Sequence, residues 1–316
     1  AGDTLDRASE RLLLTVDVQR EECCHAAGCI EFDAEGNLYL STGDNTNPFA
    51  SEGFSPSDER PGRSAWDAQR SSGNTMDLRG KILRIRPLPD GSYVCPEGNL
   101  FANGGEALGR PEIYVMGCRN PFRISLDKRR KLLFWGEVGP DAGEADTARG
   151  PQGHDEVNRA RAAGFFGWPY FVGNNKPYRD HDFATGKNGP LFDPQHPVNN
   201  SPNNTGAREL PPAQPALIWY PYGNSTEFPL LGNGGRNAMA GPVFYADEYP
   251  SDTRLPDYYD GKLITYDWMR GWMMAVTLDS SGNFSRMEPF ADSIKLNRPM
   301  DMFIDKNGSL WVLEYG

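Results

Sequence analysis

The residues with the clearest capacity for chemistry are His25 and Asp44, which stand 19 positions apart near the start of the chain. A histidine beside a carboxylate is an oriented general base, because the carboxylate fixes the imidazole tautomer and stabilises the imidazolium formed during reaction. Taken alone, the two residues are better explained by two unconnected loops, since short motif matches are often accidental. The elements around them must decide whether they meet.

The segment between the two residues has the pattern of a β-hairpin. Residues 29–32 and 38–40 alternate apolar and polar side chains, and residues 33–37 (Asp-Ala-Glu-Gly-Asn) supply turn chemistry. A hairpin returns the residue before its first strand and the residue after its second strand to the same end. The hairpin would therefore return His25 and Asp44 to the same end, and motifs further along the chain decide whether they act as a pair.

The composition indicates a chain of many short strands joined by turns and long loops. Among 316 residues there are 35 Gly and 26 Pro, and the apolar fraction is 38%. No apolar run is long enough for a membrane-spanning helix. The net charge of −11 argues against nucleic acid or an anionic membrane as partner, because both require a basic face.

The strand–turn–strand unit recurs along the chain. After the first hairpin, similar units lie at 122–136, 276–283 and 303–314, and further strands are expected at 11–18, 81–85, 111–117 and 258–266. A hairpin unit that recurs at irregular spacing is typical of a β-propeller, in which each blade contains one. A β-sandwich with similar turns is the structural alternative.

Two long stretches interrupt the strand pattern. Residues 45–79 are polar and rich in turn formers, and loops of this length are usually functional or mobile. Residues 141–240 are rich in Pro, Asn, Gly and aromatic residues, with helical character only at 155–162. We therefore expect residues 1–316 to form a single all-β domain with a loop-rich insertion at about 141–240.

The cysteines leave the disulfide pattern open. Five cysteines stand at positions 23, 24, 29, 95 and 118, and their spacing does not match a zinc site. A bridge between Cys23 and Cys24, between Cys24 and Cys29, or between Cys24 and Cys118 is compatible with the sequence. Buried free thiols are an equally good interpretation.

An ordered set of motifs gives the chain a family resemblance. The motifs are Met-Gly-Cys-Arg-Asn-Pro at 116–121, Gly-Glu-Val-Gly-Pro at 136–140, Asp-Glu-Val-Asn at 155–158 and Gly-Trp-Pro at 167–169. In this order, and after the His25 hairpin, the sequence resembles the glucose/sorbosone dehydrogenase family, soluble PQQ-dependent aldose sugar dehydrogenases that are six-bladed β-propellers. The resemblance covers residues 11 to about 170 well and 241–316 more loosely.

The resemblance implies a role for each motif residue. His25 would be the general base that takes the proton of the anomeric hydroxyl while hydride leaves for PQQ, and Asp44 would orient it. Arg119 would lie against the quinone oxygens and stabilise charge that develops there. Asn120 would form a hydrogen bond to the cofactor.

The resemblance also implies a metal and further cofactor contacts. The carbonyl groups of Gly139 and Pro140 would bind Ca²⁺, a cation that prefers oxygen ligands, and Arg270 and Arg298 would contact PQQ. The implied partners are a small sugar and an external electron acceptor such as a cytochrome, although no Cys-x-x-Cys-His haem motif occurs in this chain. The implied location is the periplasm or the extracellular space, with the export signal upstream of this chain and the propeller incomplete at its N-terminal side.

Three positions depart from the family pattern and keep alternative functions open. Met269 and Met300 stand where the family has cofactor-binding cations, and Val138 replaces a substrate-contacting Gln. A non-catalytic propeller that binds glycans or proteins is the first alternative. The second is a calcium-dependent lactonase-type hydrolase, which would hold its ion with carboxylate and Asn side chains from several blades.

Overall fold

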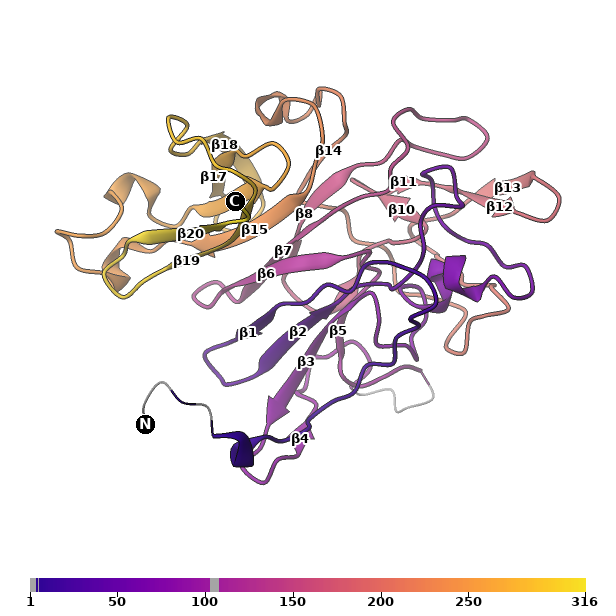
Figure 1. Cartoon of the computed structure of the whole chain (residues 1–316), viewed down its shortest axis with the longest axis horizontal. Coiled ribbons are helices and arrows are strands. Elements are labelled where there is room, and N and C mark those ends of the chain that lie inside the picture. The colour runs from indigo at the N-terminus through magenta and orange to yellow at the C-terminus, as the bar shows by residue number, and fades with distance from the viewer. Residues whose placement is uncertain (1–3, 5, 103–107) are drawn as a thin grey trace.

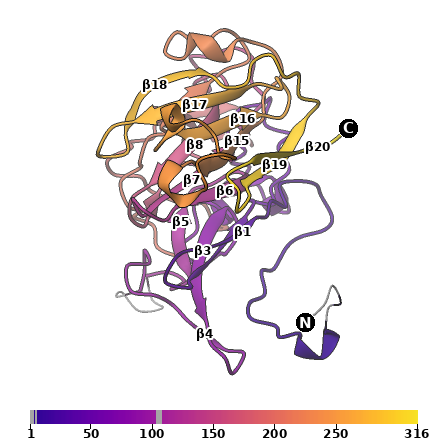
Figure 2. The ribbon, with the colours of Figure 1, turned by 90° about the vertical axis from the view of Figure 1, so that its left-hand side faces the viewer.

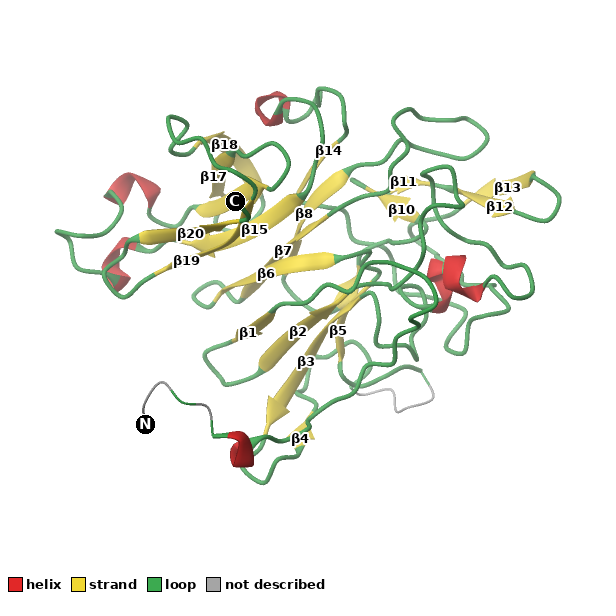
Figure 3. Cartoon of the chain, in the orientation of Figure 1, coloured by secondary structure: helices red, strands yellow, loops and turns green. Residues whose placement is uncertain are grey.

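The computed structural model describes residue 4 and residues 6–102 and 108–316, and it shows an all-β protein (Figures 1 and 3). The strands are β1 (Ile30–Phe32), β2 (Leu38–Thr42), β3 (Lys81–Pro87), β4 (Tyr93–Val94), β5 (Ile113–Met116), β6 (Pro121–Asp127), β7 (Leu132–Glu137), β8 (Asp155–Ala160), β9 (Gly164–Phe165), β10 (Phe171–Val172), β11 (Lys176–Pro177), β12 (Arg179–Asp182), β13 (Lys187–Leu191), β14 (Ile218–Tyr220), β15 (Ala238–Val243), β16 (Leu263–Asp267), β17 (Met273–Leu278), β18 (Phe284–Pro289), β19 (Pro299–Ile304) and β20 (Leu310–Glu314). Short 3-10 helices are η1 (Arg7–Ser9), η2 (Ser64–Trp66), η3 (Ala68–Arg70), η4 (Pro229–Leu231), η5 (Ala246–Glu248) and η6 (Asp257–Tyr259).

The strands form successive sheets that follow the chain. The first sheet has the order β1-β2-β3-β5, with β9 added in parallel beside β5 and β4 beside β3. The second has the order β14-β8-β7-β6, and the third β15-β16-β17-β18. The hairpin β19-β20 follows as a two-stranded sheet. The recurrent strand–turn–strand units of the sequence are therefore confirmed as hairpins within these sheets.

The strand that comes first in the sequence of each sheet contacts the corresponding strand of the next sheet. β1 contacts β6, β6 contacts β15, and β15 contacts β19, so these strands share an inner position while later strands lie further out. Figure 2 shows the sheets following one another from this side view. Sheets repeated around a shared interior are the architecture of a β-propeller, and the predicted fold class is confirmed.

Apolar side chains of neighbouring sheets fill the space between them. One cluster joins Phe134 and Val157 of the second sheet to Leu263 and Val276 of the third. Another joins Ile82 and Val115 of the first sheet to residues such as Trp135 of the second. Burial between sheets is the main stabilising term, at about 25 cal/mol per Å² of apolar surface.

Two local predictions are wrong. Residues 155–162 were expected to be helical, but β8 runs antiparallel between β7 and β14, and five of its six residues are buried. Tertiary pairing on both edges overrides the local helical character. Residues 11–18 were expected to form a strand, but they pair with no strand among the described residues, and Leu14 and Val16 only pack against the first sheet's core.

The stretch 141–240 is more structured than its composition indicates. β8 and β14 complete the second sheet and β9 extends the first, while the hairpins β10-β11 and β12-β13 lie between them. The ends of the predicted insertion are therefore part of the blade framework. Its irregular segments lie along the top and the right-hand side of Figure 1.

A disulfide bond joins the adjacent residues Cys23 and Cys24, and Cys29, Cys95 and Cys118 are free thiols. Of the pairings that the sequence left open, the first is therefore the one that forms. Nowhere in the described ranges is there a helix with the length and apolar character needed to cross a membrane.

Candidate active site

The topology carries most of the predicted site residues to one end of the sheets. In an antiparallel hairpin, the start of the first strand and the end of the second lie at the same end. The residues that stand in these places are His25 before β1, Asp44 after β2, Arg119 and Asn120 before β6, Gly139 and Pro140 after β7, Arg236 before β15, Arg270 after β16, and Arg298 before β19. We call this end the inner-strand face.

His25 and Asp44 form the hydrogen-bonded pair that the hairpin and the downstream motifs together predicted. His25 Nδ1 lies 2.7 Å from Asp44 Oδ1, and the Asp44 side chain is fully buried. An ionised carboxylate only accepts hydrogen bonds, so Nδ1 carries the proton and Nε2 presents its lone pair. Within the described part of the chain, no hydrogen-bond partner is found for Nε2, so this nitrogen is available to a ligand.

The surroundings of His25 favour the neutral imidazole. Burial is the largest influence and lowers the pKa of His25, the positive charge of Arg119 lowers it further, and Asp44 opposes both. The neutral form, which is the form that accepts a proton, therefore predominates at pH 7. A hollow of about 420 Å³, lined in part by His25, Cys23, Cys24 and Arg79, opens beside this residue.

Asp44 is held by donors from three parts of the chain. Its Oδ1 accepts the backbone N–H of Thr46 at 2.9 Å, and its Oδ2 accepts the indole N–H of Trp168 at 2.8 Å. Its own backbone N–H donates to the carbonyl group of Arg119 at 2.8 Å. The sequence alone assigns no role to Trp168 within its Gly-Trp-Pro motif, and the structure shows that it contacts the carboxylate that orients His25.

Arg119 lies beside this pair with part of its guanidinium unengaged. Its Nη1 donates to the carbonyl group of Val138 at 3.1 Å, and its side chain lies over the Trp168 ring, 5.7 Å from the centroid. The Nε group is buried, and no acceptor for it exists among the described residues. Its Nη2 group also has no acceptor among the described residues, so this amino group can donate to an acidic or quinone oxygen brought by a ligand.

Asn120 holds the backbone around His25. Its Oδ1 accepts the N–H of Ala27 at 2.9 Å. A side chain on Gly43 would collide with both the His25 carbonyl and Asn120 Oδ1, at 1.9 and 2.7 Å. Asn120 therefore positions the loop that carries the base, and only its amide N–H groups remain for the cofactor contact that the sequence predicts.

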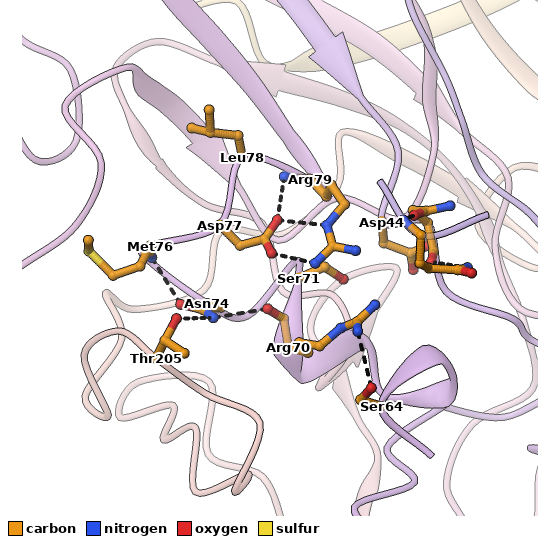
Figure 4. Close-up of polar contacts among 12 residues, drawn as sticks. Asp44, Ser64, Arg70, Ser71, Asn74, Met76, Asp77, Leu78, Arg79 and Thr205 are labelled. Carbon is orange, nitrogen blue, oxygen red and sulfur yellow. Dashed lines mark hydrogen bonds and ion pairs between the residues drawn. The ribbon is translucent and has the colours of Figure 1, made fainter. Parts of the chain in front are cut away.

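Residues 45–79 form a closely packed loop that is held by polar contacts. Arg79 binds Asp77 on the side of the loop that faces Asp44, and Asn74 links this loop to Thr205 at 3.0 Å (Figure 4). Lys81 is fully buried and donates to the carbonyl groups of Ser71, Ser72 and Arg79. Burial lowers the pKa of Lys81 to about 8.

Two buried carboxyl groups lie behind Arg119. Glu137 and Glu156 face each other across β7 and β8, and Glu137 accepts the backbone N–H of Arg119 at 3.0 Å. Burial raises the pKa of Glu137 to about 7 and that of Glu156 to about 8, and the charge of Glu137 further raises the pKa of Glu156. No sequence signal pointed to this pair, because the predicted helix would have separated the two side chains.

Comparison with known proteins assigns the chain to a family. The family model described as Glucose / Sorbosone dehydrogenase matches residues 3–207. The chain belongs to the glucose/sorbosone dehydrogenase family. This confirms the resemblance read from the motifs.

Relatives of this family member include plant and bacterial proteins. The HIPL1 protein of Arabidopsis thaliana is 26% identical over 238 residues, which is 71% of this chain and 26% of that protein. The aldose sugar dehydrogenase YliI of Escherichia coli K12 is 25% identical over 175 residues, 53% of this chain and 37% of that protein. The chain thus spans about a quarter to two fifths of the length of these curated relatives.

Solved structures support the fold. A putative oxidoreductase (glucose dehydrogenase) from Thermus thermophilus matches with a TM-score of 0.53 at 21% identity, covering 95% of this chain and 62% of that one. A second glucose dehydrogenase matches with a TM-score of 0.53 at 18% identity, covering 92% of this chain and 60% of that one. At these identities the likeness concerns the fold alone.

Arg270 and Arg298, which the resemblance predicts to contact the cofactor, differ in their hydrogen bonds and exposure. Arg270 donates to five backbone carbonyl groups of the loop 221–235, those of Pro221, Leu231, Gly232, Gly234 and Gly235. Arg270 therefore stabilises this loop and has no donor left for a cofactor. Arg298 is exposed, with its guanidinium 5.2 Å from the Trp268 ring centroid, and it can reach a ligand. Met269 beside Arg270 is 53% exposed and offers no charge.

The predicted calcium ligands do not fit a metal ion in this chain. The Pro140 carbonyl group accepts a hydrogen bond from Arg236, and the Gly139 N–H donates to Asp155 at 2.9 Å. A Ca²⁺ site needs six to eight oxygen ligands, and here a guanidinium holds one of the two expected carbonyls. Elsewhere in the described ranges, no group of three His, Cys, Asp or Glu side chains could hold a metal ion.

Proposed function

We propose that this protein is a PQQ-dependent dehydrogenase that oxidises an aldose sugar at its anomeric carbon. The observation that carries the proposal is the His25–Asp44 pair, a buried and oriented base with Nε2 available, next to the partly unengaged guanidinium of Arg119. Membership of the glucose/sorbosone dehydrogenase family supports this reaction class.

The residues at the inner-strand face suit an anionic quinone. Arg119 and Arg298 would hold the oxygens of PQQ, with the amide N–H groups of Asn120 as further donors. Bound PQQ would supply an acceptor for two electrons and a hydride, which no protein side chain provides. Calcium is not part of our proposal, because Pro140 is already engaged by Arg236.

The side chains of this chain would then carry the proton chemistry. His25 Nε2 takes the proton of the anomeric hydroxyl group, and Asp44 stabilises the positive charge that this creates on the imidazole. Trp168 and Thr46 keep the carboxylate in place, so that the imidazole cannot rotate away from Asp44. Arg119 stabilises negative charge that develops on the ligand opposite His25.

Reconstitution tests the proposal. The protein is mixed with PQQ, binding is followed by absorbance, and dye reduction is measured with a panel of aldoses. We expect turnover with at least one aldose, and a loss of about 10²- to 10⁴-fold in His25→Ala with PQQ still bound. His196→Ala is the matched control, because this side chain is 83% exposed. Failure of the wild-type protein to bind PQQ, or full activity of His25→Ala, would refute the proposal.

A non-catalytic propeller that binds glycans or proteins is the second candidate. The observations in its favour are the uncharged Met269 at the face and the complete engagement of Arg270 by backbone carbonyls. Sugar binding without any absorbance change on addition of PQQ would support it. The lactonase-type alternative has no observation in its favour, because it needs a cluster of carboxylate ligands, and the described residues contain no group of three His, Cys, Asp or Glu side chains that could hold a metal ion.

We further propose that the protein works outside the cytoplasm and passes electrons to an external acceptor. The Cys23–Cys24 disulfide supports an oxidising compartment. A cytochrome is the acceptor to test first. Stopped-flow reduction of a c-type cytochrome by the sugar-reduced protein, compared with a dye, would measure this step.

A further inference from the structure

Arg236 repeats in the third sheet the position that Arg119 holds in the second. Each stands two residues before the inner strand and is followed by an asparagine, in Arg119-Asn120 before β6 and Arg236-Asn237 before β15. Both have a buried Nε without a partner among the described residues. The two differ in their surroundings. Arg119 donates from one amino group only, to the Val138 carbonyl group, whereas both amino groups of Arg236 are engaged and its side chain has no exposed surface.

The contacts of Arg236 converge on the turn at Gly139-Pro140. One amino group forms an ion pair with Asp155 Oδ1, and the other donates to the Pro140 carbonyl group. Its guanidinium lies 4.0 Å from the centroid of the Tyr222 ring, which adds a cation–π contact. Asp155 in turn accepts the N–H groups of Gly139 at 2.9 Å and Ala238 at 2.8 Å.

The backbone around this guanidinium leaves little room for another ligand. A side-chain carbon on Gly153 would lie 1.6 Å from the Pro140 carbonyl oxygen and 2.5 Å from Arg236 Nη2. A side-chain carbon on Gly139 would lie 1.8 Å from the carbonyl oxygen of His154. Pro140 is therefore enclosed by backbone on one side and by a positive charge on the other.

We infer that Arg236 is the resident cation of the Gly139-Pro140 turn and that it excludes a divalent ion from the Pro140 carbonyl group. The guanidinium supplies a fixed positive charge next to the inner-strand face, held by Asp155. Unlike a bound ion, this charge does not depend on the free calcium concentration. The inference goes beyond the proposed sugar oxidation and does not depend on it.

The test compares calcium binding in the wild-type protein and in Arg236→Met. The variant removes the charge, keeps an apolar stem, and leaves the Asp155 carboxylate and the Pro140 carbonyl without their cation. Calcium binding is measured by isothermal titration calorimetry, and the unfolding temperature is measured with calcium and with EDTA. Arg208→Met, at an exposed arginine, is the matched control, and Arg236→Lys keeps the charge.

We expect Arg236→Met to bind calcium at least tenfold more tightly than the wild-type protein, Arg208→Met and Arg236→Lys. We also expect its unfolding temperature to rise with calcium while that of the wild-type protein is the same in calcium and EDTA. If Arg236→Met folds only in the presence of calcium, this result also supports the inference, because it shows that the variant binds calcium. Equal calcium affinity in the wild-type protein and Arg236→Met would overturn the inference. If Arg236→Met does not fold under any condition, saturable calcium binding to the wild-type protein or Arg236→Lys would overturn it, and its absence in both would support it.

Discussion

The indole nitrogen of Trp168 donates a 2.8 Å hydrogen bond to the carboxylate of Asp44, 124 positions earlier in the chain. Because Asp44 also receives the imidazole N–H of His25, the tryptophan acts on the base through the carboxylate. Trp168 is thus a positioning residue for His25. Its contact with the guanidinium of Arg119 places it between the two groups that we propose to act on the sugar and the quinone.

Trp168→Phe should raise the pKa of His25 and lower turnover. The substitution keeps an aromatic ring but removes the donor to Asp44, so the carboxylate attracts the imidazole proton more strongly. We expect a loss in kcat of about tenfold, because one hydrogen bond is worth about 1 kcal/mol or slightly more. The His25 pKa is measured by NMR titration of the imidazole nitrogens. An unchanged His25 pKa in a folded variant would show that Trp168 only packs.

The pH dependence of the base follows from its burial. Since burial and Arg119 lower the pKa of His25 below 6.5, the imidazole is neutral at pH 7 and becomes protonated only as the pH falls through this lowered value. We expect kcat/KM for the sugar to be constant above pH 7 and to decline on the acid side with an apparent pKa below 6.5. In Arg119→Met, NMR titration should show a higher His25 pKa than in the wild-type protein. A His25 pKa above 6.5 in the wild-type protein would contradict this assignment.

Glu156→Gln should stabilise the protein at alkaline pH. The folded-state pKa of Glu156 is raised to about 8 by burial, so folding favours the protonated carboxyl group. Its stabilising contribution is complete below the ordinary pKa of about 4.5 and is lost as the pH rises through about 8. The glutamine amide can donate to Asn158 Oδ1, which is buried and has no partner among the described residues. The glutamine oxygen keeps the hydrogen bond from the backbone N–H of Gly173, and the Asn158 amide must turn over, because in the wild-type protein its NH2 group donates to Glu156.

Urea unfolding at pH 5 and pH 9 checks this prediction. The free energy of unfolding of Glu156→Gln relative to the wild-type protein should increase between the two pH values by on the order of 3 kcal/mol, from about 1.4 kcal/mol per pKa unit. Glu144→Gln, at an exposed carboxylate, is the control and should show no such increase. A difference that stays constant with pH would mean that Glu156 is ionised in the folded protein.

Arg270→Met should destabilise the loop 221–235 without changing cofactor affinity. The guanidinium satisfies five backbone carbonyl groups, and hydrogen bonds from a charged group contribute about 1.5–3 kcal/mol each when their loss leaves partners unsatisfied. We expect the free energy of unfolding to fall by about 3 kcal/mol or more, with faster proteolysis in this loop. Arg208→Met serves again as the control. A large loss of PQQ affinity at unchanged stability would instead indicate that Arg270 binds the cofactor.

The sequence alone determined the features that depend on neighbours along the chain. The alternation at 29–32 and 38–40 with a five-residue turn is a local pattern that predicts the hairpin, and the ordered motifs downstream made a His25–Asp44 pair the better interpretation. The same holds for the hairpins β6-β7 and β19-β20, which bring Arg119 and Arg298 to the same end of the sheets. The family could also be identified from the sequence, because its motifs occur in a fixed order.

Only the tertiary structure decided which partners each polar group has. Trp168 reaches Asp44 across 124 positions, and Arg236 reaches Asp155 and Pro140 across 81 and 96, so no local pattern could pair them. Residues 155–160 became a strand because β7 and β14 pair with both edges. Arg270 and Arg119 are the same residue type at the same end of the sheets. One is fully engaged by a loop and the other is partly unengaged, because hydrogen bonding between distant segments is fixed only when the sheets pack together.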